Sequence, residues 1–185
     1  MAVINIKPTG HFYTGQSYNG DWTNPERAYD SSTSSYATGT QNKKNLCMRT
    51  AISEQQVTNV QFHIICRNDT NVSDNGIDIW LAYGDSSATQ IGSKVTILPG
   101  TKTTVDNTYS FNLTSSQIET VKSHLNNICI CAKGKTSYEF RLYDIYLIVT
   151  YTPISKIYAG GGSVSKIYVG GTPAKAVYLG STQIL

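Results

Sequence analysis

Apolar and polar residues alternate in many short segments of this chain, with the period of two that is typical of β-strands. In the segment 57–67 the even positions from 60 to 66 are apolar, whereas Gln61, His63 and Arg67 fall on the opposite face. Similar segments follow at short intervals, separated by turn-forming residues. The pattern predicts strands over residues 2–6, 46–52, 57–67, 77–83, 90–98, 103–113, 128–132 and 138–153.

The last of these segments is the longest aromatic and β-branched run in the chain. Strict alternation gives it two apolar faces: Tyr143, Ile145, Leu147, Val149 and Tyr151 on one, and Phe140, Leu142, Tyr146 and Ile148 on the other. This distribution predicts a central strand that is covered on both sides for part of its length. Pro153, which lacks a ladder donor, ends the strand. We expect Asp144, a lone carboxylate in the run, near a strand bulge or paired with Arg141, without a catalytic role.

A single segment has the signature of a helix, near residues 115–125. Thr114 followed by Gln117, or Ser116 followed by Glu119, has the spacing of a capping box. Many short strands with one short helix predict an all-β fold, an antiparallel β-sandwich. A jelly roll is the favoured version, because the first and last long strands can then lie side by side. An immunoglobulin-like sandwich is the alternative, but its Cys, Trp and Cys hallmark is missing.

Residues 10–45 are polar, rich in aromatic residues and without sustained periodicity. A stretch of this length either packs over a sheet or carries function. Its aromatic rings and short oxygen-bearing side chains suit carbohydrate, which gives four candidate ligand-binding residues: Trp22, Tyr29, Asp30 and Tyr36. The same residues are equally consistent with a structural role, in which the segment holds the N-terminal region against a sandwich edge and Trp22 and Tyr29 are buried. A Ca²⁺ site at Asp30 would have a single carboxylate, too few to predict a metal.

From residue 154 the chain repeats with a period of ten, and Tyr158, Tyr168 and Tyr178 are in register. One copy buries almost nothing alone, so it must stack on a neighbour. We therefore divide the chain into a sandwich, residues 1–152, and a repeat region, residues 153–185, that serves oligomerisation or anchoring. A flexible Gly-rich tail is the alternative, but a linker needs no periodic aromatics. The residues assigned to assembly are Ile157, Tyr158, Ile167, Tyr168, Val177 and Tyr178.

The charge pattern and the motif content argue against several functions. The formal net charge is +3 and the basic residues are scattered, so we expect no nucleic-acid partner. No apolar run approaches the length of a membrane span, and residues 1–6 are too short and polar for a secretory signal. The three histidines lie in unrelated contexts and no recognised catalytic motif is present. We predict a protein that is not an enzyme and has no metal or cofactor, although two converging carboxylates would escape a sequence search.

The four cysteines each lie in an apolar, strand-like segment: Cys47, Cys66, Cys129 and Cys131. Cys129 and Cys131 share a strand face two residues apart, which is poor geometry for a bond between them and is not a zinc knuckle. The sequence therefore predicts buried, reduced thiols and synthesis in a reducing compartment.

Taken together, these segments resemble structural proteins of tailed bacteriophage or prophage virions. The run from Trp22 to Ala37 is similar to a W-x-N-P-x-x-A-Y-D…Y-A pattern of virion β-sandwich domains. The helix–strand passage 113–131 and the ending 143–151 resemble the closing part of such domains, and the Lys-Ile-Tyr-Val-Gly-Gly repeats resemble Tyr-Gly repeats near the ends of tail and fibre proteins. The run from Trp22 also bears a faint similarity to galactose-binding-like modules.

The resemblance implies a non-enzymatic virion component, made in the host cytoplasm and located in the virion. It would be a head fibre, decoration protein or tail-associated appendage that forms a homo-oligomer, with a trimer favoured, and contacts other virion proteins. The alternative is a carbohydrate- or host-receptor-binding module of a phage tail or cell-surface protein, with a host glycan as partner and the repeats as a spacer.

Overall fold

The computed structural model describes residues 1–15 and 20–153, together with the residue pairs 168–169, 172–173, 178–179 and 182–183. The chain divides into two compact units, Met1–Thr152 and Pro153–Leu185, which are described separately. Within the described residues, no helix is both long and apolar enough to cross a membrane.

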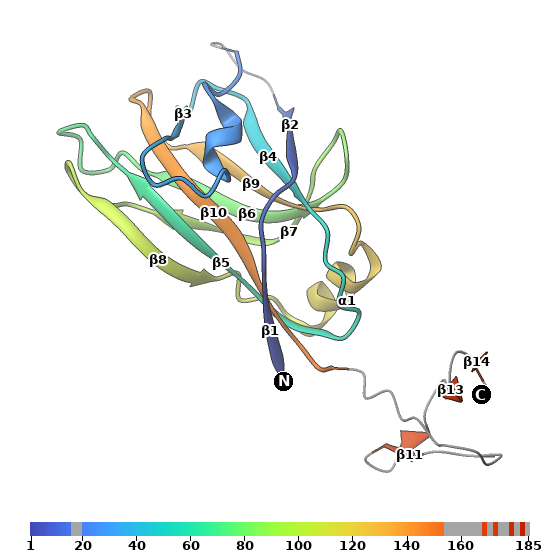
Figure 1. Cartoon of the computed structure of the whole chain (residues 1–185). Coiled ribbons are helices and arrows are strands. Elements are labelled where there is room, and N and C mark those ends of the chain that lie inside the picture. The colour runs from blue at the N-terminus through green and yellow to red at the C-terminus, as the bar shows by residue number, and fades with distance from the viewer. Residues whose placement is uncertain (16–19, 154–167, 170–171, 174–177, 180–181, 184–185) are drawn as a thin grey trace. The chain divides into compact units, whose positions relative to one another are not determined.

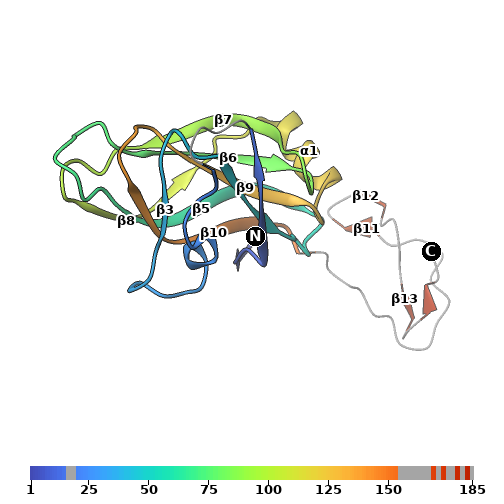
Figure 2. The same cartoon turned by 90° about the horizontal axis from the view of Figure 1, so that it is seen from above.

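The first unit is a sandwich of two antiparallel sheets (Figures 1 and 2). The first sheet has the order β1 (Ala2–Ile6), β10 (Phe140–Tyr151), β5 (Val57–Arg67) and β8 (Thr104–Ser110), and β3 (Ala37–Gly39) also pairs with β10. The second sheet has the order β2 (Gly10–Thr14), β4 (Asn45–Thr50), β9 (Ile128–Gly134), β6 (Ile77–Tyr83) and β7 (Thr89–Ile97).

The strand order is that of a jelly roll, as the sequence predicts. From β4 to β10 the chain changes sheet at every connection except that between β6 and β7, which form a hairpin within the second sheet. β1 lies beside β10, with Ala2 opposite Tyr151 and Ile6 opposite Leu147. The first and last strands of the sandwich therefore lie side by side in the first sheet, with β1 at its edge. The strand pattern of the sequence missed only β2 and β3, which lie inside the aperiodic stretch 10–45.

A bulge in β10 changes which side chains of the longest strand share a face, compared with the prediction from strict alternation. The register against β5 shifts between Leu142 and Asp144, so that an extra residue is inserted into the strand. Phe140 and Leu142 consequently point to the same interior as Leu147, and all three are fully buried. Strict alternation had placed Phe140 and Leu142 opposite Leu147, and that assignment is wrong. The expected position of Asp144 beside a bulge is confirmed.

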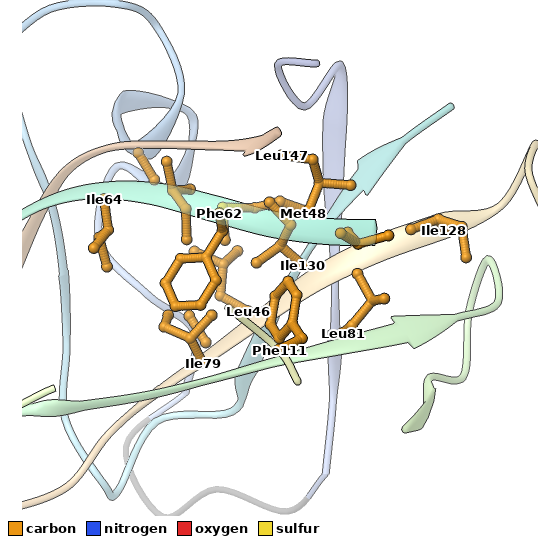
Figure 3. Close-up of a cluster of buried hydrophobic side chains, with 14 of the residues drawn as sticks. Leu46, Met48, Phe62, Ile64, Ile79, Leu81, Phe111, Ile128, Ile130 and Leu147 are labelled. Carbon is orange, nitrogen blue, oxygen red and sulfur yellow. The ribbon is translucent and has the colours of Figure 1, made fainter. Parts of the chain in front are cut away.

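The core fills the space between the two sheets (Figure 3). Phe62 of β5 contacts Phe111, with ring centroids 4.8 Å apart, and it stacks on Tyr109 at 5.6 Å. Apolar side chains of the second sheet face them, and these are fully buried: Leu46, Met48, Ile79, Leu81, Ile128 and Ile130. Burial of this apolar area is the main favourable contribution to the fold.

The helix α1 (Ser115–Ser123) lies where the sequence predicts it and begins with the predicted capping box. The Thr114 hydroxyl accepts a hydrogen bond from the Gln117 amide at 3.4 Å, and the Gln117 side chain accepts one from the Thr114 amide at 2.9 Å. Ile118 and Val121 bury the inner face of the helix. The capping pair is therefore Thr114 with Gln117 rather than Ser116 with Glu119.

The second unit contains two short antiparallel hairpins among its described residues. β11 (Tyr168–Val169) pairs with β12 (Thr172–Pro173), and β13 (Tyr178–Leu179) pairs with β14 (Thr182–Gln183). The two hairpins are offset by ten residues, the period of the sequence repeat, because each begins at the tyrosine of one copy. Of the residues assigned to assembly, Tyr168 and Tyr178 are strand residues, whereas Ile157, Tyr158, Ile167 and Val177 lie outside the described residues.

Candidate functional site

Trp22, the first candidate ligand-binding residue, is only 4% exposed. Its indole nitrogen donates a hydrogen bond to the Lys44 carbonyl at 3.0 Å. The ring lies against Gly39, where an added Cβ would be 2.4 Å from it, so that position is restricted to glycine by the close approach. Trp22 therefore packs over the end of β3 and has no ring face open to a ligand.

Tyr29 also turns toward the interior, at the sandwich edge beside β2. Its hydroxyl and the Nδ1 of His11 are 2.9 Å apart, and its ring is half-buried against the core. Burial raises the pKa of Tyr29, and burial reinforced by Asp21 raises the pKa of neighbouring Tyr13 to about 12. Trp22 and Tyr29 thus fasten the 20–36 segment to the sandwich, which is the second of the two roles open from the sequence.

Asp30 organises a turn. Its carboxylate accepts hydrogen bonds from the Ser32 amide and the Ser35 hydroxyl, both at 2.8 Å. This geometry is an Asx turn and explains the acidic residue without a ligand. Among the residues that the structure describes, no group of three His, Cys, Asp or Glu side chains lies close enough to hold a metal ion.

Tyr36, the fourth candidate, lies on the outer face of the first sheet. The Arg141 guanidinium is 4.4 Å from its ring centroid, and the Tyr143 ring meets it edge-on at 5.3 Å. Arg141 also forms an ion pair with Asp69, which pairs in turn with Arg67. We call these five residues the Tyr36 cluster.

A second group of aromatic and charged residues lies further along β10 on the same outer face. Tyr146 stacks on His63, its register partner on β5, with centroids 4.9 Å apart. Lys7 lies 5.2 Å from the Tyr146 centroid and contacts both carboxylate oxygens of Asp144 at 2.6 Å. The Nε2 of His63 is 3.0 Å from Asp106 on β8. Lys7, His63, Asp106, Asp144 and Tyr146 are the Tyr146 cluster.

The bulge in β10 and the alternation along β5 bring the two clusters to one face. His63 points outward because Phe62 and Ile64 point into the core. After the bulge, Tyr146 occupies the outward position beside His63. The sequence signal for His63 was its polar position in an apolar strand. The Lys7–Asp144 pair joins residues 137 apart in the chain, and no local pattern indicates it.

The outer face of the second sheet is different. Trp80, Cys131, Cys47 and Phe12 are register partners in a row across β6, β9, β4 and β2. The structure joins Cys47 and Cys131 in a disulfide. The prediction of reduced thiols is therefore wrong for this pair, whose partners lie on neighbouring strands. Cys66 and Cys129 are free and buried, and burial raises the pKa of each thiol to about 12.

This row is covered by the protein's own side chains. Trp80 is 4% exposed and lies under Lys94, whose ammonium is 4.5 Å from the ring centroid. The Arg49 guanidinium lies 4.8 Å from the Phe12 centroid and donates a hydrogen bond to the Asp85 carbonyl at 2.7 Å. Trp80, the largest ring of this row, is therefore less accessible than the half-buried tyrosines of the first sheet.

A shallow hollow of about 290 Å³ lies beside α1, away from both clusters. It is lined by Val57, Thr58, Leu113, Ser115, Ile118, Glu119 and Lys122. Lys122 pairs with Glu119 across one helical turn, at 2.8 Å. The lining has no aromatic ring, so the hollow is a weaker candidate than the outer face of the first sheet.

The fold and the site define a jelly-roll β-sandwich with an aromatic and charged sheet face. No family model and no curated protein matches the chain. Among solved structures it is similar to one described as "CBM4 structure and function", with 10% sequence identity, a TM-score of 0.33, and coverage of 64% of this chain and 82% of that one. This TM-score is too low to support any inference about the chain, and the fold is assigned from the strand pairing alone.

Proposed function

We propose that the sandwich is a non-enzymatic binding module and that its ligand is a carbohydrate. The observation that carries the proposal is the outer face of the first sheet, where two clusters combine half-buried tyrosines with charged groups. Tyrosine rings offer an apolar face and a polar tip, which suits the alternating C–H and hydroxyl surfaces of a sugar. Lys, Arg and Asp side chains supply donors and acceptors for the hydroxyl groups.

The carboxylates of this face favour binding over catalysis. Both oxygens of Asp144 contact Lys7, and the residue is only 7% exposed. Asp69 is shared between Arg67 and Arg141. These carboxylates orient the cations beside the aromatic rings, which is a positioning role and does not require them to reach a bond in the ligand.

A glycan array tests the proposal with the full-length chain. We expect reproducible binding that the Tyr146→Ala variant loses and the Tyr138→Ala variant retains. Tyr138 is 52% exposed and outside both clusters, so it controls for the loss of a surface tyrosine. Absence of binding to every glycan, or equal binding by the two variants, would show that this face is not a carbohydrate site.

A second proposal concerns the context in which the module acts. We propose that the protein is a structural appendage of a tailed-phage virion, assembled as a homo-oligomer, with a trimer favoured, against other virion proteins. The observation that favours it is the ten-residue repeat, which continues as the hairpins β11–β12 and β13–β14. Short hairpins bury little surface alone and gain stability from a neighbour. The two proposals are compatible, since a virion appendage can carry a glycan-binding domain.

Truncation after Pro153 tests the assembly role. We expect circular dichroism to show that the truncated chain keeps its fold. Light scattering should give the molar mass of a monomer instead of that of an oligomer, and the truncated chain should not be incorporated into virions. A truncated chain that keeps the oligomeric state and the virion incorporation of the full chain would contradict the role given to the repeats.

A further inference from the structure

We infer that the ligand of the outer face is an uncharged oligosaccharide that extends along β10 and contacts both the Tyr36 cluster and the Tyr146 cluster. This inference rests on the proposed carbohydrate-binding function and adds the charge and the length of the ligand. It follows from two properties of the face, the pairing of its charges and the distance between its aromatic rings.

The charges of the face are paired within the protein. Lys7 pairs with Asp144, His63 contacts Asp106, and Arg67 and Arg141 share Asp69. Counted without His63, the two clusters together hold three cations and three carboxylates: Lys7, Arg67 and Arg141 against Asp69, Asp106 and Asp144. An anionic ligand would be repelled by those carboxylates or would have to displace them, and a cationic ligand would meet the same obstacle from the cations.

An uncharged polyhydroxylated ligand meets no such obstacle. Each ion pair keeps donor and acceptor capacity beyond its partner, because an ammonium has three donors, a guanidinium has five, and a carboxylate accepts at about four positions. Hydroxyl groups can use this remaining capacity without breaking a pair. Arg141, whose side chain is 34% exposed, and Lys7, at 37%, are the cations that lie beside the aromatic rings.

The tyrosines of the two clusters are too far apart for one sugar ring to stack on both. Tyr143, whose ring meets Tyr36 edge-on, and Tyr146 are three positions apart on β10. At about 3.3 Å per residue of strand, this separation is about 10 Å, slightly less with the bulge. A monosaccharide can stack on the tyrosines of only one cluster at a time. A linear oligosaccharide that follows β10 can contact both and gains affinity from each.

Titration calorimetry on the full-length chain tests the inference once the array has named a sugar. The probes are that sugar as a monosaccharide, its neutral linear oligomers, and the same oligomers carrying carboxylate or sulfate groups. We expect the neutral oligomers to bind best, the monosaccharide to bind at least about tenfold more weakly, and the affinity to change less than about twofold between low and high salt. Tyr36→Ala and Tyr146→Ala should each weaken oligomer binding, with Tyr138→Ala as the control.

The outcomes separate this inference from the function on which it rests. Preferred binding of the charged oligomers, with affinity that falls as salt rises, overturns the uncharged ligand and leaves carbohydrate binding intact. Equal affinity for monosaccharide and oligomer, or loss of binding in only one of Tyr36→Ala and Tyr146→Ala, overturns the extended ligand. Absence of binding to any glycan removes both the function and the inference.

Discussion

The outer faces of the two sheets use aromatic residues in different ways. On the second sheet, Trp80 and Phe12 flank the Cys47–Cys131 disulfide, and Lys94 and Arg49 lie over the rings. On the first sheet, the Tyr36 and Tyr146 clusters contain ion pairs, and their rings stay partly exposed.

Both faces come from the same period-two pattern, so alternation alone does not distinguish a face that stabilises the fold from one that binds. The difference lies in what covers the rings. Fully buried Cys129 and Cys131 extend the apolar cluster of the second sheet, whereas Asp144 and Asp106 keep the first sheet polar. We therefore expect substitutions on the second sheet to change stability and substitutions on the first to change binding.

Replacement of Trp80 by alanine should have the largest effect on stability. Removal of a buried aromatic side chain costs about 3 to 5 kcal/mol in unfolding free energy. Urea unfolding followed by circular dichroism measures it, with Tyr138→Ala, an exposed aromatic, changing stability by less than about 0.5 kcal/mol. A Trp80→Ala variant as stable as the wild type would show that the ring is not part of a packed cluster.

Loss of the disulfide should follow in magnitude. Cys47 and Cys131 are 84 residues apart, so the bond restricts a long loop of the unfolded chain. Removal of a native disulfide costs about 2 to 5 kcal/mol. We expect reductant to lower the unfolding free energy of the wild type and to leave a Cys47→Ser/Cys131→Ser double variant unchanged. Equal sensitivity of the two proteins, or none in either, would contradict the pairing.

Lys7→Ala tests how much the Lys7–Asp144 ion pair of the first sheet stabilises the fold. It should lower the unfolding free energy less than the two preceding changes do. It leaves the Asp144 carboxylate, 7% exposed, without its partner, at a cost of about 1 to 3 kcal/mol. Lys122→Ala is the matched control, because it breaks an exposed helical pair worth less than about 1 kcal/mol. If both variants lose the same stability, the Lys7–Asp144 pair contributes no more than a surface ion pair.

Sequence patterning was sufficient for the fold class and for most of the strands, although it missed β2 and β3. Strand β5 begins and ends at the predicted residues, and α1 has its predicted capping box. Both depend on local signals, alternation in one case and side-chain capping in the other. The pairing of β1 with β10 also followed, because a jelly roll brings the first and last strands together.

The bulge, the disulfide and the site depend on contacts between distant residues. A single inserted residue in β10 reverses the face of Phe140 and Leu142, and alternation has no means of detecting it. Cys47 and Cys131 meet only because β4 and β9 are in register. Of the four predicted ligand-binding residues only Tyr36 lies on the candidate face, since aromatic composition does not separate a ring that packs from one that binds.

The most direct test of the account is to compare glycan binding by Tyr146→Ala and Trp80→Ala, each measured per mole of folded protein at a temperature where both are folded. We predict that Tyr146→Ala keeps nearly wild-type stability and loses binding, whereas Trp80→Ala is destabilised and keeps wild-type affinity. Loss of affinity in Trp80→Ala with full affinity in Tyr146→Ala would place the binding site on the second sheet and contradict the account.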